Sequence, residues 1–343
     1  MSTVHLVVPP DLDDCRRTSG GNVYDRRVRR GLVTSGWTVV EHLVAASPGA
    51  LATALGGLRD SATVLLDGLV ASTSPDEALR HAERLRIVLL LHLPMGIASD
   101  HPAAHAGEAR LLRASRAVVV TSEWTRQRLL DRYPLSAHGV HAAEPGVDLD
   151  EPAVASDRGD RLLCVAALTP GKGHDVLLTA LAGLTDLAWS CVCVGSADRD
   201  PVHADCIQRR SRELGLADRV RFAGSLTGGE LAASYATSDL LVHPSRFESY
   251  GMVVTEALAR GLPVVTTSAG ALPETLGLAS GGRPGLLVPP DDAEALADAL
   301  RRWLCDAALR ERLRTVAHRR RTELPGWSRT VATVGRVLRE VAA

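Results

Sequence analysis

The chain has 343 residues, 45% hydrophobic and 23% charged, so it is long enough for two globular domains of ordinary composition. Its net charge of −1 shows no basic excess, and we expect no nucleic-acid partner. No uncharged apolar run reaches about 18 residues, so we expect no membrane span, while peripheral membrane contact stays open.

The first ten residues lack a basic region before their apolar run, which is typical of a first strand rather than a secretion signal. The six cysteines show no zinc-site spacing. Cys191 and Cys193 lie two residues apart in one apolar run, so they share one face of the expected strand. We therefore expect buried, unpaired thiols and a cytoplasmic protein. The sequence carries no signal for a particular oligomeric state.

Short apolar segments alternate with amphipathic segments of helical length along the chain. We expect strands at residues 4–8, 38–42, 63–66, 87–92, 117–121, 161–165, 190–194, 220–223, 240–243, 263–266 and 285–288. We expect helices at residues 22–35, 75–84, 123–133, 175–182, 204–214, 229–237, 253–260, 292–306 and 308–322. Such alternation is typical of parallel sheets with helices on both faces.

The pattern breaks over residues 145–159, a stretch with little apolar periodicity. We therefore expect an α/β protein with two doubly wound, Rossmann-like domains, residues 1–150 and 151–327. The C-terminal helix, residues 328–343, is expected to pack back on the first domain. Ligands of such sheets bind beyond the carboxyl ends of the strands, so two facing sheets predict an interdomain cleft.

Lys172 is the only lysine among 39 Lys and Arg residues, and it lies in the sequence Pro-Gly-Lys-Gly-His-Asp directly after an expected strand. Free backbone N–H groups at the start of the next helix, together with a compact ammonium, suit a phosphate. The sequence matches neither a Walker A loop nor a dinucleotide-binding loop. The alternative is a surface turn in which Asp175 caps the helix.

Two glutamates, Glu248 and Glu256, lie in the loop after the strand expected at 240–243 and about one turn into the following helix. Gly251 between them allows the backbone to approach a ligand closely. Carboxylates accept hydrogen bonds from hydroxyls, so the two would suit a ligand with a sugar at each end. The alternative is that both are solvated glutamates in the first turns of a helix, where the helix dipole favours them.

Two further motifs follow strands in the first half of the chain. Gly20 and Gly21 precede a long helix and offer backbone N–H groups to an anion, unless this is a loop in which Asn22 caps the helix. His92 ends an apolar strand, where the alternative is a structural histidine with satisfied hydrogen bonds.

Together and in this order, the motifs resemble glycosyltransferase family 4, whose members are retaining, nucleotide-sugar-dependent enzymes with the GT-B fold. The resemblance extends from Gly20 to Trp327, and its most specific part is the pair of glutamates with seven residues between them. The supporting matches lie at residues 20–21, 117–126, 145–148, 170–173 and 270–274.

The resemblance implies a role for each matching position. Lys172 would neutralise the leaving diphosphate, Glu248 would bind hydroxyls of the donor sugar, and Glu256 would bind the nucleotide ribose. His92 would contact the donor sugar. The other implied contacts are with sugar or phosphate at Gly251 and Met252, with the diphosphate at Gly20 and Gly21, with the base near Phe222, and with the acceptor at Asn22 and Tyr24.

One position departs from the family pattern. Many members carry an arginine five residues before the lysine as a second contact with the diphosphate, and here that residue is Ala167. Arg246 and His174 are the nearest candidates to replace it. No metal and no cofactor are implied, since the nucleotide sugar is a substrate and the Asp-x-Asp sequence at residues 198–200 is a lone match in an expected loop.

We therefore expect a retaining glycosyltransferase of the hexosyltransferase type that uses a nucleotide-diphosphate sugar. The compact chain favours a small, hydroxyl-bearing acceptor over a polymer, with acceptor loops at residues 11–17 and 95–105. One alternative is a nucleotide-sugar epimerase with the same fold. Another is a non-catalytic sugar-nucleotide binder, which Ala167 slightly favours.

Overall fold

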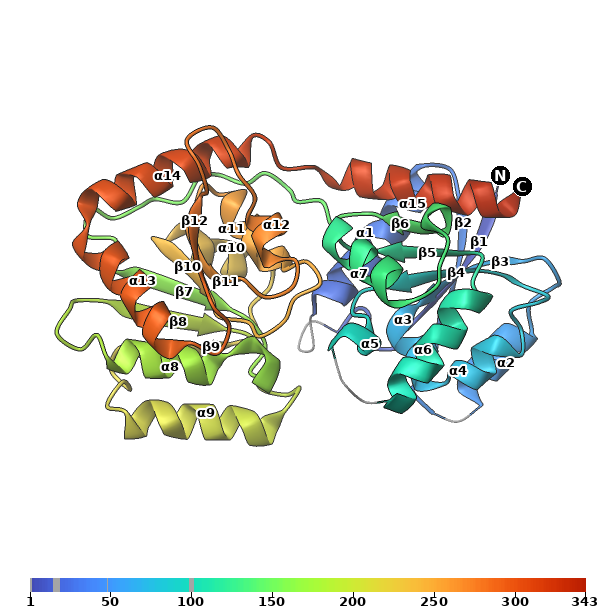
Figure 1. The fold of residues 1–343 in the computed structure, drawn as a ribbon, viewed down its shortest axis with the longest axis horizontal. Coiled ribbons are helices and arrows are strands. Elements are labelled where there is room, and N and C mark those ends of the chain that lie inside the picture. Colours follow the sequence, from blue (N-terminus) through green and yellow to red (C-terminus); the bar gives the residue numbers. More distant parts are fainter. Residues whose placement is uncertain (1, 15–18, 48, 99–101) are drawn as a thin grey trace. The chain divides into compact units, whose positions relative to one another are not determined.

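The computed structural model describes residues 2–14, 19–47, 49–98 and 102–343. They form two compact units, each built around one parallel sheet (Figure 1). Unit 1 comprises residues 2–13, 20–146 and 326–343, and unit 2 comprises residues 147–325 together with Asp14 and Ser19. The sequence predicts boundaries at 150 and 327, whereas the chain passes between the units at 146–147 and 325–326.

The sheet of unit 1 has six parallel strands in the order β2-β1-β3-β4-β5-β6. The strands are β1 (Thr3–Val8), β2 (Thr38–Leu43), β3 (Thr63–Asp67), β4 (Arg86–Leu91), β5 (Ala117–Val120) and β6 (Val140–Ala142). The helices are α1 (Gly20–Thr34), α2 (Ala50–Gly56), α3 (Gly68–Thr73), α4 (Pro75–Leu79), α5 (Met95–Ala98), α6 (Pro102–Ala114), α7 (Glu123–Arg132), the 3-10 turn η2 (Ala137–Gly139) and α15 (Trp327–Ala342).

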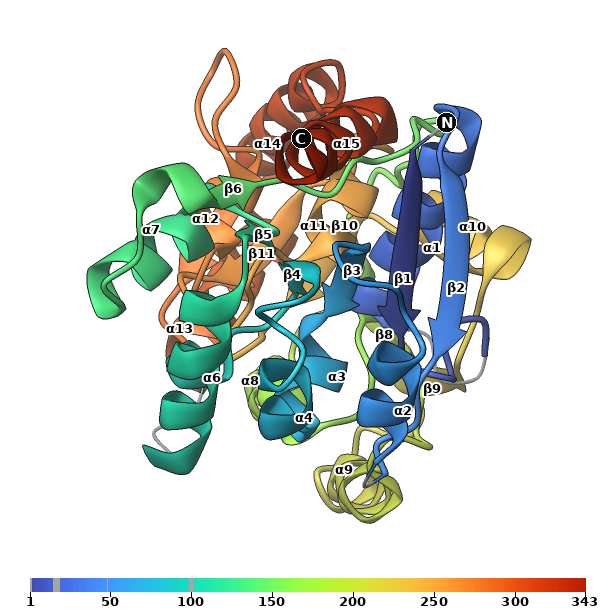
Figure 2. The same ribbon diagram turned by 90° about the vertical axis from the view of Figure 1, so that its right-hand side faces the viewer.

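Helices cover both faces of this sheet, and its strands β3, β4 and β5 are almost wholly buried. Val64 and Leu66 of β3 pack in the core with α2, α3, α4, α6 and α7, whereas Leu65 packs in the core with α1 and α15 (Figure 2). Because neighbouring side chains of a strand point to opposite faces, a sheet covered on both sides needs continuous apolar strands.

The C-terminal helix α15 packs against α1 within unit 1. The two helices approach so closely that a Cβ atom at Gly31 of α1 would lie 2.2 Å from Cγ2 of Val331. Tyr24 of α1 packs edge-on against Trp327, with ring centroids 5.8 Å apart, and its hydroxyl donates to the Ala143 carbonyl. Glycine at position 31 therefore permits this helix pair.

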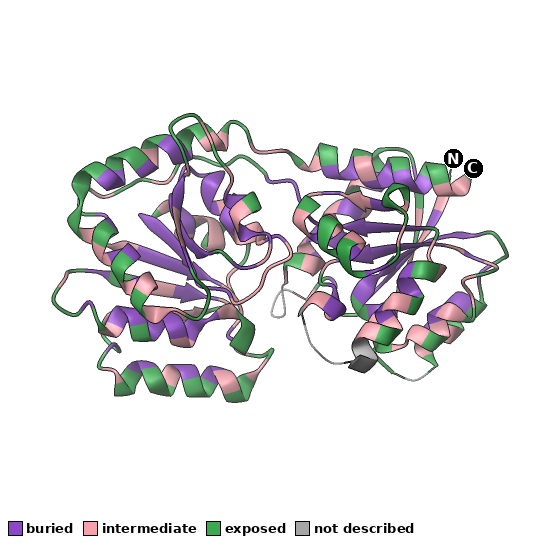
Figure 3. Cartoon of the chain, viewed as in Figure 1, coloured by how far each residue is buried: buried purple, intermediate pink, exposed green. Residues whose placement is uncertain are grey.

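The sheet of unit 2 has the order β12-β11-β10-β7-β8-β9, again all parallel. Its strands are β7 (Arg161–Val165), β8 (Ser190–Val194), β9 (Val220–Gly224), β10 (Leu240–His243), β11 (Val264–Thr267) and β12 (Gly285–Val288). Its helices are η3 (Pro170–Lys172), α8 (His174–Ala182), α9 (Pro201–Glu213), α10 (Gly228–Ala236), α11 (Met252–Leu258), α12 (Leu272–Leu276), α13 (Ala293–Cys305) and α14 (Ala307–Arg321). Helices α8, α9 and α13 cover one face, and α10, α11 and α12 cover the other, and the strands β7, β10 and β11 between them are almost wholly buried (Figure 3).

The predicted fold class, two doubly wound parallel sheets with helices on both faces, is confirmed. The structure adds the short strand β6, which sequence analysis did not predict. Part of the expected loop at 95–105 is helical, in α5 and α6, and residues 99–101 lie outside the described part. The helix predicted at 75–84 ends at Leu79, and the following turn lets Arg84 donate to the carbonyls of Leu55 and Leu58.

No helix in the described ranges combines the length and the apolar content that crossing a bilayer requires. Five cysteines are described, and all five are free: Cys164, Cys191 and Cys193 are buried, whereas Cys206 and Cys305 are exposed. The expectation of buried thiols is therefore correct for three of them and wrong for two, and Cys15 lies outside the described residues.

Candidate active site

Unit 2 brings Lys172 and Glu248 together where the strand order of its sheet reverses. The chain runs from β7 outward through β8 to β9 and then returns to β10 on the other side of β7. Ligands of doubly wound sheets bind at such a switch point, beyond the carboxyl ends of the two strands. Lys172 lies in the turn after β7, Glu248 lies in the loop after β10, and Lys172 Nζ donates to Glu248 Oε1 over 2.6 Å.

The same carboxylate oxygen accepts two further hydrogen bonds from its own loop. His243 Nε2 lies 3.0 Å and Ser245 Oγ lies 2.8 Å from Glu248 Oε1. Burial alone would raise the pKa of Glu248, but the Lys172 ammonium and the His243 hydrogen bond outweigh it and hold the pKa well below its usual range. Glu248 is therefore a fixed carboxylate, and its Oε2 has no hydrogen-bond partner in the described part of the chain.

Glycine conformation fixes the turn that carries Lys172. Gly173 has a φ of 68°, and a Cβ atom there would lie 2.1 Å from the Pro244 carbonyl oxygen. The backbone N–H of Arg246 donates to the Gly171 carbonyl, which joins this turn to the loop of Glu248. The alternative that Asp175 caps this helix is wrong, because Gly173 is the N-cap and Asp175 instead binds Arg246.

Glu256 lies in α11, whose N-cap is Gly251 with a φ of 90° and whose first residue is Met252. Its Oε2 accepts a hydrogen bond of 2.8 Å from the hydroxyl of Tyr235, a fully buried residue of α10. The Arg260 guanidinium lies over the Tyr235 ring, 4.7 Å from its centroid, and donates to the Glu256 carbonyl. Tyr235 therefore fixes the direction of the Glu256 carboxylate.

Both candidates to replace the arginine absent at Ala167 contact other residues of unit 2 in this structure. The Arg246 guanidinium is bound to Asp175 by two hydrogen bonds and also pairs with Asp291. His174 is only 1% exposed and has its Nε2 atom 3.8 Å from Cys164 Sγ in the core. Lys172 is therefore the cation that contacts Glu248 at this switch point.

Phe222, the predicted base contact, lies in β9 and packs its partly buried ring against the core beside α8 and α9. Asp200 of the Asp-x-Asp sequence caps α9 by accepting from the His203 N–H. This contact explains Asp200 as a helix cap.

In unit 1, His92 follows β4 and bonds to Asp25 of α1. Gly20 and Gly21 begin α1, and a Cβ atom at Gly21 would lie 3.3 Å from Cδ2 of the His92 ring. The alternative that Asn22 caps this helix is wrong, because Asn22 is its third residue and donates to the Asp11 carbonyl.

Unit 1 thus gathers Gly20, Gly21 and His92, and unit 2 gathers Lys172 and Glu248. That both groups line one cleft stays a prediction. Five side chains that hold the predicted ones were not predicted from the sequence, namely His243, Ser245, Tyr235, Asp25 and Asp67. Of these, His243 and Ser245 lie within five residues of Glu248 and could have been noticed from that spacing.

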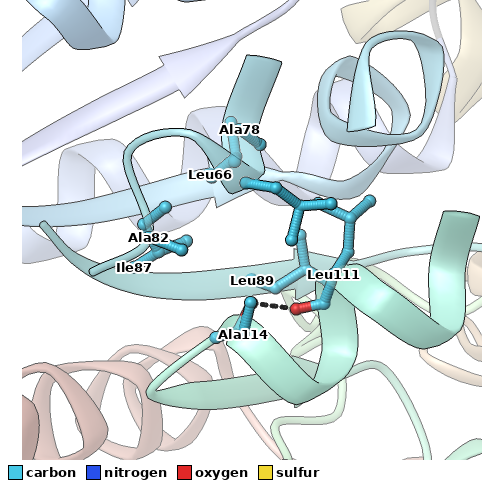
Figure 4. Close-up of a pocket in the computed structure, with 9 residues that line it drawn as sticks. Leu66, Ala78, Ala82, Ile87, Leu89, Leu111 and Ala114 are labelled. Carbon is cyan, nitrogen blue, oxygen red and sulfur yellow. Dashed lines mark hydrogen bonds between the residues drawn. The ribbon is translucent and has the colours of Figure 1, made fainter. Parts of the chain in front are cut away.

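A small hollow in unit 1 is a packing gap. It is lined by Leu66, Ala78, Leu79, Ala82, Ile87, Leu89, Leu111, Ala114 and Ser115 (Figure 4). Its free volume of about 10 Å³ is no more than one water molecule needs. The lining is almost wholly aliphatic, and the Ser115 hydroxyl is bound to the Leu111 carbonyl, so the hollow offers no group for chemistry.

Solved structures of glycosyltransferases share this fold. Sucrose-phosphate synthase from Thermosynechococcus elongatus has a TM-score of 0.82 and 22% identity over 99% of both chains. Anabaena HepE in complex with UDP-glucose has a TM-score of 0.82 and 16% identity over 99% of this chain and 100% of its own. At these identities the likeness shows the fold, which is GT-B.

Curated relatives match at higher identity. A GDP-mannose-dependent alpha-(1-6)-phosphatidylinositol monomannoside mannosyltransferase of Mycolicibacterium smegmatis is 30% identical over 84% of this chain and 79% of its own length. A D-inositol 3-phosphate glycosyltransferase of Frankia alni is 32% identical over 72% of this chain and 64% of its own length. This chain spans less than two thirds of several such inositol-phosphate relatives. The model of the family described as glycosyl transferases group 1 matches residues 149–320, and the chain belongs to this family.

Proposed function

We propose that the protein transfers a sugar, with retention of anomeric configuration, from a nucleoside-diphosphate sugar to a hydroxyl group of an acceptor. The observation that carries the proposal is the bonding of Glu248 Oε1 to Lys172, His243 and Ser245 at the switch point of unit 2. Three donors on one oxygen orient the carboxylate and leave Oε2 to accept hydrogen bonds from sugar hydroxyls.

Lys172 supports the departure of the diphosphate. Cleavage of the bond to the anomeric carbon builds negative charge on the leaving phosphate, and a fixed ammonium stabilises that charge more than it stabilises the ground state. In the free protein the ammonium is held by Glu248, which places it before the donor binds. This arrangement needs no metal ion, and none is part of the proposal.

The charge state of Glu248 argues for its role as a hydrogen-bond acceptor. A carboxylate whose pKa is held far below its usual range is a weak base and a weak nucleophile. We therefore infer that the leaving phosphate accepts the proton of the attacking hydroxyl on the same face of the sugar. Attack from that face retains the anomeric configuration.

Glu256 is proposed to bind the ribose of the donor. Tyr235 donates to Oε2 and so orients this carboxylate, and carboxylate oxygens accept hydrogen bonds from hydroxyls such as those of a ribose. The two glutamates would thus contact the two sugars of a nucleoside-diphosphate sugar.

Release of nucleoside diphosphate, with and without acceptor, tests the proposal. The names of the relatives and of the structural neighbour suggest GDP-mannose and UDP-glucose as donors, with inositol 3-phosphate and phosphatidylinositol monomannoside as acceptors. We expect acceptor-dependent release and an α-linked product from an α-linked donor. Isomerised donor without release would instead support an epimerase, and tight donor binding without either reaction would support a non-catalytic binder.

A further inference from the structure

Two buried carboxylates of unit 1 lie close to the same ring nitrogen of His92. Its Nε2 atom lies 2.8 Å from Asp25 Oδ1 of α1 and 3.5 Å from Asp67 Oδ2 at the end of β3. The Asp25 and Asp67 side chains are 2% and 3% exposed, and that of His92 is 18% exposed. Among the described residues, this is the group of three whose atoms converge closely enough to share an ion.

Electrostatics determines which ion the group holds. Two neighbouring buried carboxylates need a counter-charge to stay ionised, because burial and mutual repulsion both favour protonation. Burial lowers the pKa of His92, but the attraction of Asp25 and Asp67 outweighs it and raises the pKa to about 9. Burial and repulsion by Asp25 raise the pKa of Asp67 to about 6. At neutral pH the counter-charge is therefore a proton on the imidazole.

The surrounding groups fix the orientation of the ring. The edge with Cδ2 faces Gly21, and the Tyr24 ring meets the imidazole edge-on with centroids 5.1 Å apart. Burial raises the pKa of Tyr24, whose hydroxyl is bound to a carbonyl, so Tyr24 adds no charge. Asp67 is fixed in turn, since its Oδ1 accepts from the Val70 N–H.

The other ring nitrogen, Nδ1, lies across the ring from Cδ2. In the described ranges this nitrogen has no hydrogen-bond partner. It is not fully buried, so a ligand can reach it. An imidazolium carries a proton on both nitrogens, so fixing Nε2 leaves Nδ1–H as a cationic donor.

We propose that Asp25 and Asp67 are positioning residues that hold His92 as an imidazolium, so that its Nδ1–H donates a charge-assisted hydrogen bond to an oxygen of the nucleotide sugar. The identity of this ligand rests on the proposed function, whereas the charge of His92 does not. A neutral histidine carries only one N–H proton. That proton would lie on Nε2, which faces the carboxylates, and Nδ1 would have no proton to donate to the ligand.

Histidine-selective NMR of the full chain tests the charge without any activity assay. The His92 signal is assigned with His92→Gln and followed between pH 5.5 and 9.5. We expect the N–H protons on both ring nitrogens of His92 to persist at pH 7.5 in the wild type. Asp25→Asn should lower the midpoint by roughly one to three units, and Asp67→Asn should lower it less because that contact is longer.

Asp76→Asn is the matched control, since it removes an exposed carboxylate of the same unit that pairs with Arg110 instead. It should leave the His92 midpoint unchanged. A wild-type midpoint near 6.5, or an unchanged midpoint in both Asp25→Asn and Asp67→Asn, would overturn the proposal. The use of two variants keeps the test decisive if one of them fails to fold.

The pH dependence of kcat/KM for the donor tests the role of Nδ1–H. The upper pH limit should lie near the NMR midpoint in the wild type and should move down with it in Asp25→Asn. A limit that does not follow the midpoint would overturn donation to the nucleotide sugar. Failure of transfer with every donor would count against the proposed function, while the NMR midpoints would still decide the charge of His92.

Discussion

The Lys172 ammonium lies 2.6 Å from the Glu248 carboxylate, so the single lysine of the chain is paired with a negative charge before any donor binds. A diphosphate must therefore share this ammonium with Glu248. The carboxylate that positions the cation also weakens its attraction for a free nucleoside diphosphate.

Glu248→Gln separates these two effects. The substitution keeps the size of the side chain but removes its charge, so UDP or GDP should bind severalfold more tightly at low salt. Transfer should slow by more than about tenfold, because a neutral amide accepts sugar hydroxyls more weakly. Calorimetric titration at two salt concentrations and turnover assays measure both effects. Weaker binding of the diphosphate would contradict the pairing, and Asp186→Asn, the same loss of charge in an exposed ion pair with Arg301, serves as the control.

Lys172→Ala should lower turnover by more than tenfold, since one positioned charge contributes about 3–4 kcal/mol to such a transition state. Lys172→Arg should recover little of it, because a planar guanidinium does not reproduce a compact ammonium at the Glu248 carboxylate. Circular dichroism would verify the fold, and Asp186→Asn, which changes an exposed ion pair with Arg301, is the surface control. Near-normal turnover in Lys172→Ala would refute the assignment.

Tyr235→Phe tests whether Glu256 binds a ribose. Loss of the hydroxyl frees the carboxylate to rotate, so the KM for the donor and the Kd for UDP or GDP should rise severalfold while kcat changes little. Binding of a 2′,3′-dideoxy analogue should not change. Tyr133→Phe is a matched control, because it removes a tyrosine–glutamate hydrogen bond to Glu108 in unit 1. If Tyr235→Phe weakened binding of the nucleotide and of its 2′,3′-dideoxy analogue equally, the ribose contact would be contradicted.

Much of the candidate site was predictable because its residues follow strands. Lys172 and Glu248 come after β7 and β10, and parallel strands bring their carboxyl ends to one edge of the sheet. Tyr235 was not predictable from α10, since a buried tyrosine is ordinary core until its hydroxyl partner is known. Asp25 and Asp67 are equally ordinary in the sequence, and only the adjacency of α1, β3 and β4 brings them to His92.

The limits on the fold prediction have similar causes. Strand β6 has only three residues, too few for an alternating pattern to show. The alternative that Asn22 caps α1 failed because asparagine at a helix start usually caps the helix, whereas here the buried Asn22 bonds to Asp11 in another segment.

The stability of the wild type should fall as the pH rises from about 6.5 to about 9. His92 binds its proton more tightly folded than unfolded, so its contribution is complete below the unfolded pKa of 6.5 and is lost as the pH passes the folded value of about 9. The difference corresponds to about 3 kcal/mol. Urea unfolding at several pH values measures this change in the free energy of unfolding. If that free energy fell as steeply with pH in Asp25→Asn as in the wild type, the pairing of His92 with Asp25 would not be its cause.

Gly31→Ala should destabilise unit 1 without involving any ligand. The new methyl group would overlap Val331, so α1 and α15 must separate or shift, which costs about 1–3 kcal/mol. Thermal unfolding should begin at a lower temperature. Gly56→Ala in α2, where a Cβ atom meets nothing within 4 Å, should be neutral or slightly stabilising.

The order of segments in unit 1 has a consequence during synthesis. Residues 147–325 lie between its sheet and α15, whose Val334, Val337 and Leu338 complete its core. On the ribosome, unit 2 can therefore fold while unit 1 still exposes the apolar side of α1, with Tyr24 and Leu32 uncovered. A nascent chain arrested before Trp327 would present this surface to chaperones and proteases, even with every residue of unit 2 already made.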